Sequence, residues 1–175
     1  MNRPDKPINK RLHLVRQVVR WLRMTLWRVR LMKKLTVGRN VFFGRNCYLA
    51  PPAHLGIGDN VAIGSDFHLE SNLTIGSDVL ISSRVSIVGN DHRFDDPSLT
   101  VFCAGRLPPS SVIIEGDNLI GHGVIIVGNA RIGRGAIVGA GSVVSKDLPP
   151  NMVCYGVPAR PMKSRLKSPN TQTAT

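Results

Sequence analysis

Apolar residues recur at every sixth position through most of the chain. The register begins at Val37, slips by two residues after Leu49, and is interrupted between Ile87 and Ile114. Neither the 3.6-residue period of an α-helix nor the two-residue period of a β-strand produces this spacing. The apolar positions of the repeat are Val37, Phe43, Leu49, Ile57, Ile63, Leu69, Ile75, Ile81, Ile87, Ile114, Ile120, Ile126, Ile132, Val138 and Val144.

Two other positions of the repeat have preferences of their own. The next residue is often glycine, at Gly38, Gly44, Gly58, Gly64, Gly76, Gly121, Gly133 and Gly139. The fifth position is small or apolar, for example at Ala53, Val61, Val79, Val124 and Leu148. Short strands joined by tight turns, which glycine would relieve, explain this pattern. Three hexapeptides would close a triangular coil, and coils would stack about 4.8 Å apart by parallel pairing, so the sequence predicts an all-β parallel β-helix.

The segment VGAGSVVSKDLPPNMVCYGVPARPM, residues 138–162, closes the repeat region. Together with the hexapeptides before it, this segment resembles the hexapeptide-repeat acyltransferases, and most of all their sugar O-acetyltransferase-like subgroup. The resemblance covers about residues 37–163. It implies a left-handed parallel β-helix, although general crossover rules favour the opposite hand. It also implies a homotrimer that uses acetyl-CoA as co-substrate and a sugar or glycan as acceptor.

The repeat is interrupted between two polar residues, Asp91 and Asn118, which stand at fifth positions that are otherwise small or apolar. Between them lies a long excursion, residues 93–113, which includes Phe94 and Phe102. Loops of this length are usually functional or disordered, and polar residues at core positions are expected at functional sites. The resemblance implies that the loop reaches over a neighbouring subunit and helps to enclose the active site.

His92 lies at the end of the coil just before this excursion, where the family has its catalytic histidine. Acyl transfer needs a general base that takes a proton from a hydroxyl or amine as it attacks a thioester carbonyl, and imidazole suits this role near neutral pH. The developing oxyanion needs a fixed donor, which the resemblance assigns to backbone N–H groups at Gly121 and His122. The alternative is that His92 only caps the last regular strand and that the loop is an ordinary insertion.

Further site residues follow from the resemblance. The acceptor would be bound by His68, Glu70, Asp91 and Arg93. Acetyl-CoA would be bound by Leu119, His122, Ala140, Ser145, Lys146 and Arg160, with small residues beside the pantetheine arm and basic residues at the phosphates. The family usually has tryptophan at the position of Leu119, so the pantetheine or acyl chain is expected to be held differently here.

A metal site is not expected. Carbonic anhydrases of the same fold bind zinc through three histidines, but the histidines here are widely separated. His68 and His92 are 24 residues apart, whereas residues that stack in one column differ by three hexapeptides. The three cysteines, Cys47, Cys103 and Cys154, have no ligand-like spacing, and their odd number fits a reducing compartment.

The formal charge of +12 is confined to the ends of the chain. Residues 1–36 carry +10 and residues 160–175 carry +4, whereas residues 37–159 carry −2. Residues 8–35 are predicted to form an amphipathic helix with one apolar stripe, made of Ile8, Leu12, Val15, Val19, Leu22, Leu26 and Val29. Such a helix suits an anionic membrane surface, and the alternative is that its stripe caps the open end of the β-helix. Nucleic acid is not an expected partner, because the body of the protein is almost neutral.

The sequence therefore predicts three parts: a basic helical arm at 1–36, a β-helix at 37–149, and a C-terminal extension at 150–175 that is disordered after about 166. The protein is expected in the cytoplasm, with its helix on the inner face of the cell membrane, because neither a signal peptide nor a spanning segment is evident. The expected activity is acetyl transfer to a sugar hydroxyl in surface polysaccharide or glycan biosynthesis. N-acetylation of an amino sugar, acetylation of a small molecule such as an antibiotic, and a non-catalytic membrane-tethered scaffold stay open as alternatives.

Overall fold

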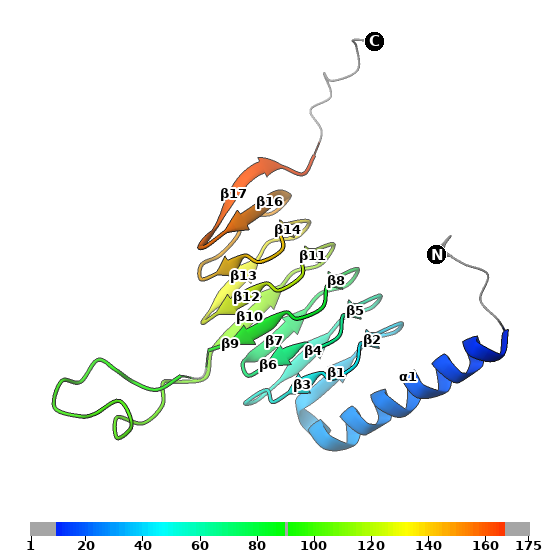
Figure 1. Cartoon of the computed structure of the whole chain (residues 1–175), viewed down its shortest axis with the longest axis horizontal. Helices are drawn as coiled ribbons and strands as arrows, with labels where there is room; N and C mark the ends of the chain where they lie inside the picture. The colour runs from blue at the N-terminus through cyan, green and yellow to red at the C-terminus, as the bar shows by residue number, and fades with distance from the viewer. Residues whose placement is uncertain (1–9, 90, 167–175) are drawn as a thin grey trace, which may run out of the picture.

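A helix and a stack of short parallel strands make up the computed structural model, which describes residues 10–89 and 91–166. The helix α1 (Lys10–Leu31) is followed by a 3-10 turn (Met32–Lys34) and then by seventeen strands. The strands stack as a solenoid, with α1 against its first coil and the last strands at its other end (Figure 1). The segment expected to be disordered after about 166 lies outside the described residues.

The strands form three sheets, which are numbered here in the order in which the chain enters them. Sheet 1 consists of β1 (Leu35–Val37), β4 (Leu55–Ile57), β7 (Asn72–Ile75), β10 (Ser111–Ile114) and β13 (Ala130–Ile132). Sheet 2 consists of β2 (Phe42–Phe43), β5 (Ala62–Ile63), β8 (Leu80–Ile81), β11 (Leu119–Ile120), β14 (Ile137–Val138), β16 (Met152–Gly156) and β17 (Ala159–Ser164). Sheet 3 consists of β3 (Tyr48–Leu49), β6 (His68–Leu69), β9 (Ser86–Val88), β12 (Ile125–Val127) and β15 (Val143–Val144). All pairs are parallel except β16 with β17, so the predicted parallel β-helix is confirmed.

Each hexapeptide turns two side chains inward. Ile81, Ile87, Ile120 and Ile126 are buried, as the sixfold repeat requires, and the fifth positions fill the gaps between them. Branched aliphatic side chains stacked in this way bury apolar surface without any need for a second layer. Ala53 was expected at an inward fifth position but is exposed, because the two-residue slip moves Leu55 into that column beside Leu73.

The glycines of the repeat allow neighbouring coils to approach closely. A Cβ atom on Gly121 would lie 2.5 Å from the backbone nitrogen of Ala140 in the next coil. The expectation that these glycines relieve the turns is wrong, because the left-handed turn residues come two positions later, at Asn60 (φ 57°) and Gly141 (φ 69°) for example. Asparagine, aspartate and glycine tolerate this conformation better than other residues, which explains their place in the repeat.

Differences in coil length all occur where the chain passes from sheet 3 to sheet 1, which we call the variable corner. Stacked residues there are 20, 39 and 16 apart (Leu35 with Leu55, Leu73 with Val112, Ile132 with Leu148), whereas Leu55 and Leu73 show the regular 18. The passage from sheet 2 to sheet 3 always takes six residues between inward side chains in the described coils, and we call it the constant corner. The long excursion belongs to the variable corner and spans residues 89–110 rather than 93–113, because Val112 is already back in the core.

Helix α1 covers the first coil with the face that carries Met24, Trp27 and Leu31. Trp27 and Leu31 are buried, and the Arg23 guanidinium donates hydrogen bonds from Nη1 to the Phe43 and Gly44 carbonyl oxygens at 2.8 and 2.5 Å. The stripe expected to do the capping faces away, since Val19, Leu22, Leu26 and Val29 are exposed. Ile8 lies outside the described residues, as do the side chains of Leu12 and Val15. The helix therefore caps the solenoid, but through a different face from the one predicted.

Candidate active site

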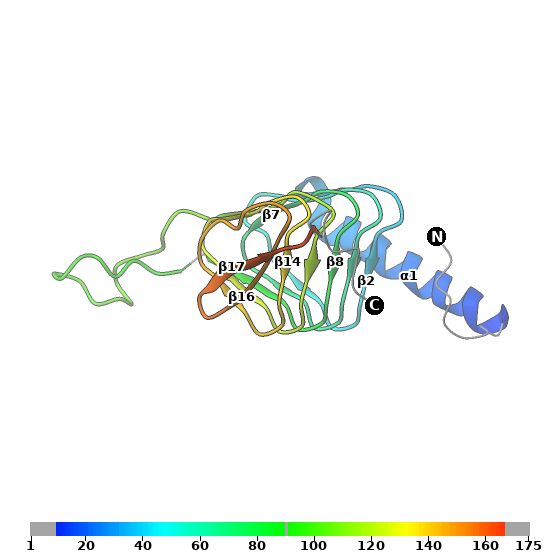
Figure 2. The ribbon, with the colours of Figure 1, turned by 90° about the horizontal axis from the view of Figure 1, so that it is seen from above.

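His92 lies at the base of an arm that projects from the variable corner. Two stretches of the excursion pair with each other, since Arg93 N–H donates to the Gly105 carbonyl at 2.9 Å and Leu107 N–H to the Asp91 carbonyl at 2.8 Å. His92 stands opposite Arg106 in this antiparallel pairing and is half-buried. Beyond it the arm extends far from the solenoid and carries Phe102 with 91% of its surface exposed (Figures 1 and 2). The base position is thus held by the fold, whereas the tip has side chains free to contact another molecule.

Two buried serines tie the base of the arm to the solenoid. The Ser71 hydroxyl donates to the Ser110 carbonyl at 2.8 Å, and the two hydroxyl oxygens are 2.9 Å apart. Ser110 N–H donates to the Gly89 carbonyl at 3.2 Å, which closes the neck of the excursion. We did not predict these residues from the sequence, although small polar residues at both ends of a break were a usable signal.

The two polar interruptions of the repeat have different roles. Asn118 is 3% exposed and occupies an inward position, where its Oδ1 accepts from Gly116 N–H at 2.8 Å and its Nδ2 donates to the Gly133 and Ala136 carbonyls at 2.8 and 3.0 Å. Backbone hydrogen bonding alone accounts for this residue. Asp91 is exposed and outside the column, and its Oδ1 accepts from His92 N–H at 3.0 Å. Only the second interruption marks the excursion.

The proposed acceptor residues fall into two groups. His68 and Glu70 lie one coil before His92, with His68 Nε2 3.2 Å from Glu70 Oε1, and the Tyr48 ring stacks on the His68 ring with centroids 4.8 Å apart. Tyr48 was not predicted as a site residue, but its register beside His68 in sheet 3 follows once the two-residue slip is counted. Arg93 lies on the arm and bonds Asp95, where Nε donates to Oδ1 at 3.3 Å, and this hydrogen bond lowers the pKa of Asp95.

The constant corner holds the proposed oxyanion donors. Gly121 N–H already donates to the Val138 carbonyl at 2.8 Å, so the expectation that it binds an oxyanion is wrong for this structure. The His122 carbonyl accepts from Gly141 N–H at 2.8 Å, but within the described chain no acceptor is found for His122 N–H. Of the two predicted donors, His122 is the one that can bind a ligand here. Exposed Ala140 lies beside it, and Leu119 is on the outer face of sheet 2.

The remaining predicted CoA residues lie elsewhere on the surface. Ser145 and Lys146 follow β15 and are exposed at the variable corner, two coils beyond the arm. Arg160 lies on β17, where its Nη1 donates to the neighbouring Ala159 carbonyl at 3.2 Å. The predicted CoA residues therefore belong to both corners and to the last strand.

One chain keeps the base and the oxyanion donor apart. His122 precedes β12 and Gly128 follows it, so the two corners are separated by six residues of sheet 3, or about 20 Å at roughly 3.3 Å per residue. A general base must lie within hydrogen-bonding reach of the proton that it removes, while the oxyanion forms on the carbon under attack. A site that uses both groups therefore needs the variable corner of one copy beside the constant corner of another.

Comparison with known families and structures agrees with this architecture. The bacterial transferase hexapeptide family (six repeats) matches residues 111–146. The chain belongs to the hexapeptide-repeat acyltransferase family. A search of curated proteins gives no significant match for this hexapeptide-repeat protein.

Solved structures similar to the hexapeptide-repeat chain are acyltransferases with a bound coenzyme. A hexapeptide-repeat acetyltransferase from Vibrio cholerae in complex with acetyl-CoA is 25% identical, with a TM-score of 0.68 and coverage of 84% of this chain and 78% of that one. AntD, an N-acyltransferase from Bacillus cereus bound to dTDP and coenzyme A, is 26% identical, with a TM-score of 0.67 and coverage of 77% and 75%. A galactoside acetyltransferase in complex with coenzyme A is 26% identical, with a TM-score of 0.61 and coverage of 81% and 69%.

Metal ligands do not gather in this hexapeptide-repeat protein. Among residues 10–89 and 91–166, no three histidine, cysteine or acidic side chains lie close enough to hold an ion together. The thiols of Cys47 and Cys154 have their pKa raised mainly by burial, so both side chains are packed as neutral groups.

Proposed function

We propose that the protein transfers an acetyl group from acetyl-CoA to a sugar hydroxyl, in the synthesis of a surface polysaccharide or a related glycan. The observation that carries this proposal is the placement of His92 on a fixed arm base at one corner and of the unpaired His122 N–H at the other. The similarity to acyltransferases with bound CoA supports the reaction class, and the galactoside acetyltransferase supports a sugar acceptor.

His92 is the proposed general base. Its imidazole takes the proton from the acceptor hydroxyl while the hydroxyl oxygen bonds to the thioester carbonyl carbon. The C–S bond of the tetrahedral intermediate then breaks, and the imidazolium returns the proton to the CoA sulfur. Asp91 orients the base, since its carboxylate accepts from the His92 backbone N–H. His122 N–H of the neighbouring copy stabilises the oxyanion in this scheme.

The two substrates are proposed to lie on opposite sides of these groups. The acceptor would contact the arm, including Arg93, and the Tyr48–His68–Glu70 cluster, whose stacked rings and carboxylate suit the flat face and hydroxyls of a sugar. CoA would follow the groove beside Leu119, His122 and Ala140 of one copy and Ser145 of the next. Lys146 and Arg160 are both exposed and are available to its phosphates.

A homotrimer follows from this arrangement as a further part of the proposal. Contact between two different corners is heterologous, and heterologous contacts close into a ring when the rotation between copies is a whole fraction of a turn. A three-sided solenoid suits closure at three copies, which would form three equivalent sites. The family resemblance predicts the same assembly.

The decisive experiment measures thiol release from acetyl-CoA with a panel of nucleotide sugars, free sugars and lipid-linked glycans. His92→Ala should lose acceptor-dependent release by 10²- to 10⁴-fold, the usual share of a general base, while calorimetric binding of CoA persists. His54→Ala is the matched control, because His54 is exposed and bonds only Thr74 on the outside of sheet 1. Equal activity of His92→Ala and wild type would remove His92 from the mechanism, and absence of CoA binding in both would favour the scaffold alternative.

A second candidate is acylation of an amino sugar, which the likeness to the dTDP-bound N-acyltransferase favours. A neutral amine is a better nucleophile than a hydroxyl and depends less on a base. Matched pairs of nucleotide-linked sugars that differ only in amino against hydroxyl would separate the candidates. A rate on the amino member that survives His92→Ala would favour N-acylation.

A further inference from the structure

We propose that the outward face of α1, with the pocket at its C-terminal end, binds the surface of an anionic phospholipid bilayer. The helix would lie on the bilayer, because none of the helices in the described chain is long and apolar enough to cross one. This inference concerns attachment of the protein and is independent of the proposed acetyl transfer.

Helix α1 is apolar on two opposite faces. Leu22 and Leu31 are nine residues apart and point in opposite directions at 3.6 residues per turn. Leu31 is buried against the first coil with Trp27, whereas the face around Leu22 is exposed and reaches 68% at Val29. One face thus fixes the helix to the solenoid, and the other presents a row of apolar side chains: Val18, Val19, Leu22, Leu26 and Val29. Trp21, 66% exposed at the edge of this row, stands where interfacial tryptophans are found.

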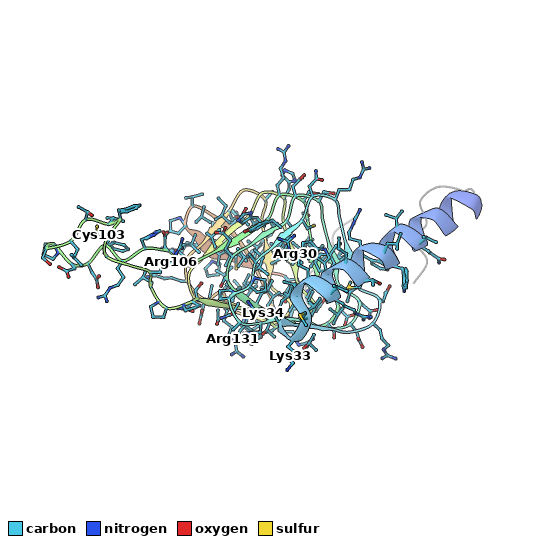
Figure 3. The ribbon with its side chains drawn as sticks, turned by 90° about the horizontal axis from the view of Figure 1, so that it is seen from below. Arg30, Lys33, Lys34, Cys103, Arg106 and Arg131 are labelled. Atoms are coloured by element: carbon cyan, nitrogen blue, oxygen red, sulfur yellow. The ribbon has the colours of Figure 1, made fainter. Side chains whose placement is uncertain are left out.

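A basic pocket continues this face at the C-terminal end of the helix. It has a volume of ≈ 660 Å³ and is lined by Arg30, Lys33 and Lys34 together with residues 49–52 of the first coil. Lys34 is held at its wall by a 3.3 Å hydrogen bond from Nζ to the Pro51 carbonyl. Arg30 lies over the Trp27 ring at 5.6 Å. Figure 3 shows the three cationic residues around the junction of α1 with the solenoid, where they would meet phosphate headgroups.

Charge favours a lipid surface over a second copy of the chain. Residues 10–34 contain nine lysines and arginines, and no acidic residue occurs anywhere between Lys6 and Gly58. Two such helices packed face to face would bring like charges together, whereas anionic headgroups neutralise them. Apolar side chains with flanking cations are the composition that binds the bilayer interface.

The first test is flotation of the full-length protein with vesicles of phosphatidylcholine alone, and with vesicles in which about one third is phosphatidylglycerol. Wild type should float with the anionic vesicles, and Leu22→Glu/Val29→Glu should bind at least about tenfold more weakly. The matched control, Met162→Glu/Leu166→Glu, places the same charges on exposed positions at the far end of the solenoid and should bind as wild type does. Equal binding to both vesicle types, or undiminished binding of the helix variant, would overturn the proposal. So would a change in the oligomeric state of that variant without lipid, because the face would then join copies of the chain.

The second test addresses the pocket. Arg30→Gln/Lys33→Gln should weaken binding to the anionic vesicles by about 25-fold, since each cation near such a surface contributes roughly fivefold. Arg45→Gln/Arg84→Gln changes the net charge equally at exposed turns of the solenoid and should have a much smaller effect. Soluble glycerol phosphate at matched ionic strength should not displace the protein, and displacement would mean that the pocket binds free phosphate instead. Tryptophan emission should shift to the blue on anionic vesicles, and Trp21→Phe should abolish the shift because Trp27 is already buried.

Discussion

The variable corner and the constant corner of this solenoid are built from the same hexapeptide, yet only one of them changes length. At the variable corner, coils differ from the regular 18-residue spacing by gains of 2 and 21 residues and a loss of 2. A loop there can lengthen at small entropic cost, because the strand that follows regains its register on the coil below. At the constant corner, glycine backbones touch the next coil, and a side chain or an extra residue has no room.

The difference explains how the two corners divide the chemistry proposed here. A corner that accepts insertions can carry a histidine and an arm shaped for an acceptor. A corner with fixed backbone geometry can offer an N–H at an invariant place, which is what oxyanion stabilisation needs. A site that needs both must take them from two copies, since sheet 3 separates the corners within one chain.

Mixing two inactive variants gives the largest expected effect. His92→Ala removes the base from the variable corner, and Ala140→Trp blocks the groove at the constant corner. Each alone should lose most activity, whereas co-expressed chains should form mixed trimers in which about a quarter of the sites pair an intact His92 with an intact Ala140. Steady-state rates of the purified mixture measure this recovery. No recovery, with mixed trimers verified by two affinity tags, would place the whole site within one chain.

Rigidity of the constant corner predicts a large loss of stability for Gly121→Ala. The new Cβ would meet the Ala140 backbone nitrogen at 2.5 Å, and overpacking of this kind costs about 1–3 kcal/mol. Urea denaturation measures the change in free energy of unfolding. Gly56→Ala is the control, because its Cβ would lie no closer than 4.0 Å to Thr74. Equal stability of the two variants would contradict the close approach of the coils.

The two polar interruptions can be separated in the same assay. Asn118→Val leaves the Gly116 N–H and two carbonyl oxygens without their partner in the core, and each unpaired buried group costs about 1–3 kcal/mol. Asp91→Val removes an exposed carboxylate and should leave the unfolding midpoint almost unchanged. Similar losses for both variants would mean that Asp91 also supports the fold.

The arm tip is expected to affect the acceptor alone. Phe102 is almost fully exposed, so Phe102→Ala should leave stability and the KM for acetyl-CoA unchanged. Loss of one aromatic contact with a sugar should raise the acceptor KM by about fivefold to tenfold. Steady-state kinetics with each substrate varied in turn would show this. An increase confined to the KM for acetyl-CoA would assign the arm to the coenzyme.

The smallest expected effect is the pH dependence due to Glu115. Arg134 N–H and the Arg131 guanidinium bond its carboxylate and lower its pKa. A depressed folded-state pKa stabilises the protein above the ordinary carboxyl value, and this contribution disappears as the pH falls through the folded-state pKa. Glu115→Gln should therefore lower the thermal midpoint at pH 7 and have no effect near pH 3. A difference that persists unchanged in acid would assign the effect to packing.

Much of this protein follows from short-range pattern. The sixfold period, the inward ladders, the break at His92 and the basic helix can all be read from the chain, because every hexapeptide repeats the same local conformation. The family resemblance then placed candidate residues such as Lys146 and Arg160, whose roles stay predictions.

Contacts between coils and between faces were decided only by the tertiary structure. Stacking offsets of 20 and 39 residues determine that Tyr48 lies on His68 and that Val112, rather than Asp91, fills the core column. The Val138 carbonyl occupies Gly121 N–H, which no single hexapeptide reveals. Helix α1 offers two apolar faces in its sequence, and only the shape of the first coil selects Trp27 and Leu31 for burial. A repeating pattern specifies which side chains turn inward, but the partner of each group depends on how far apart in sequence the stacked neighbours are.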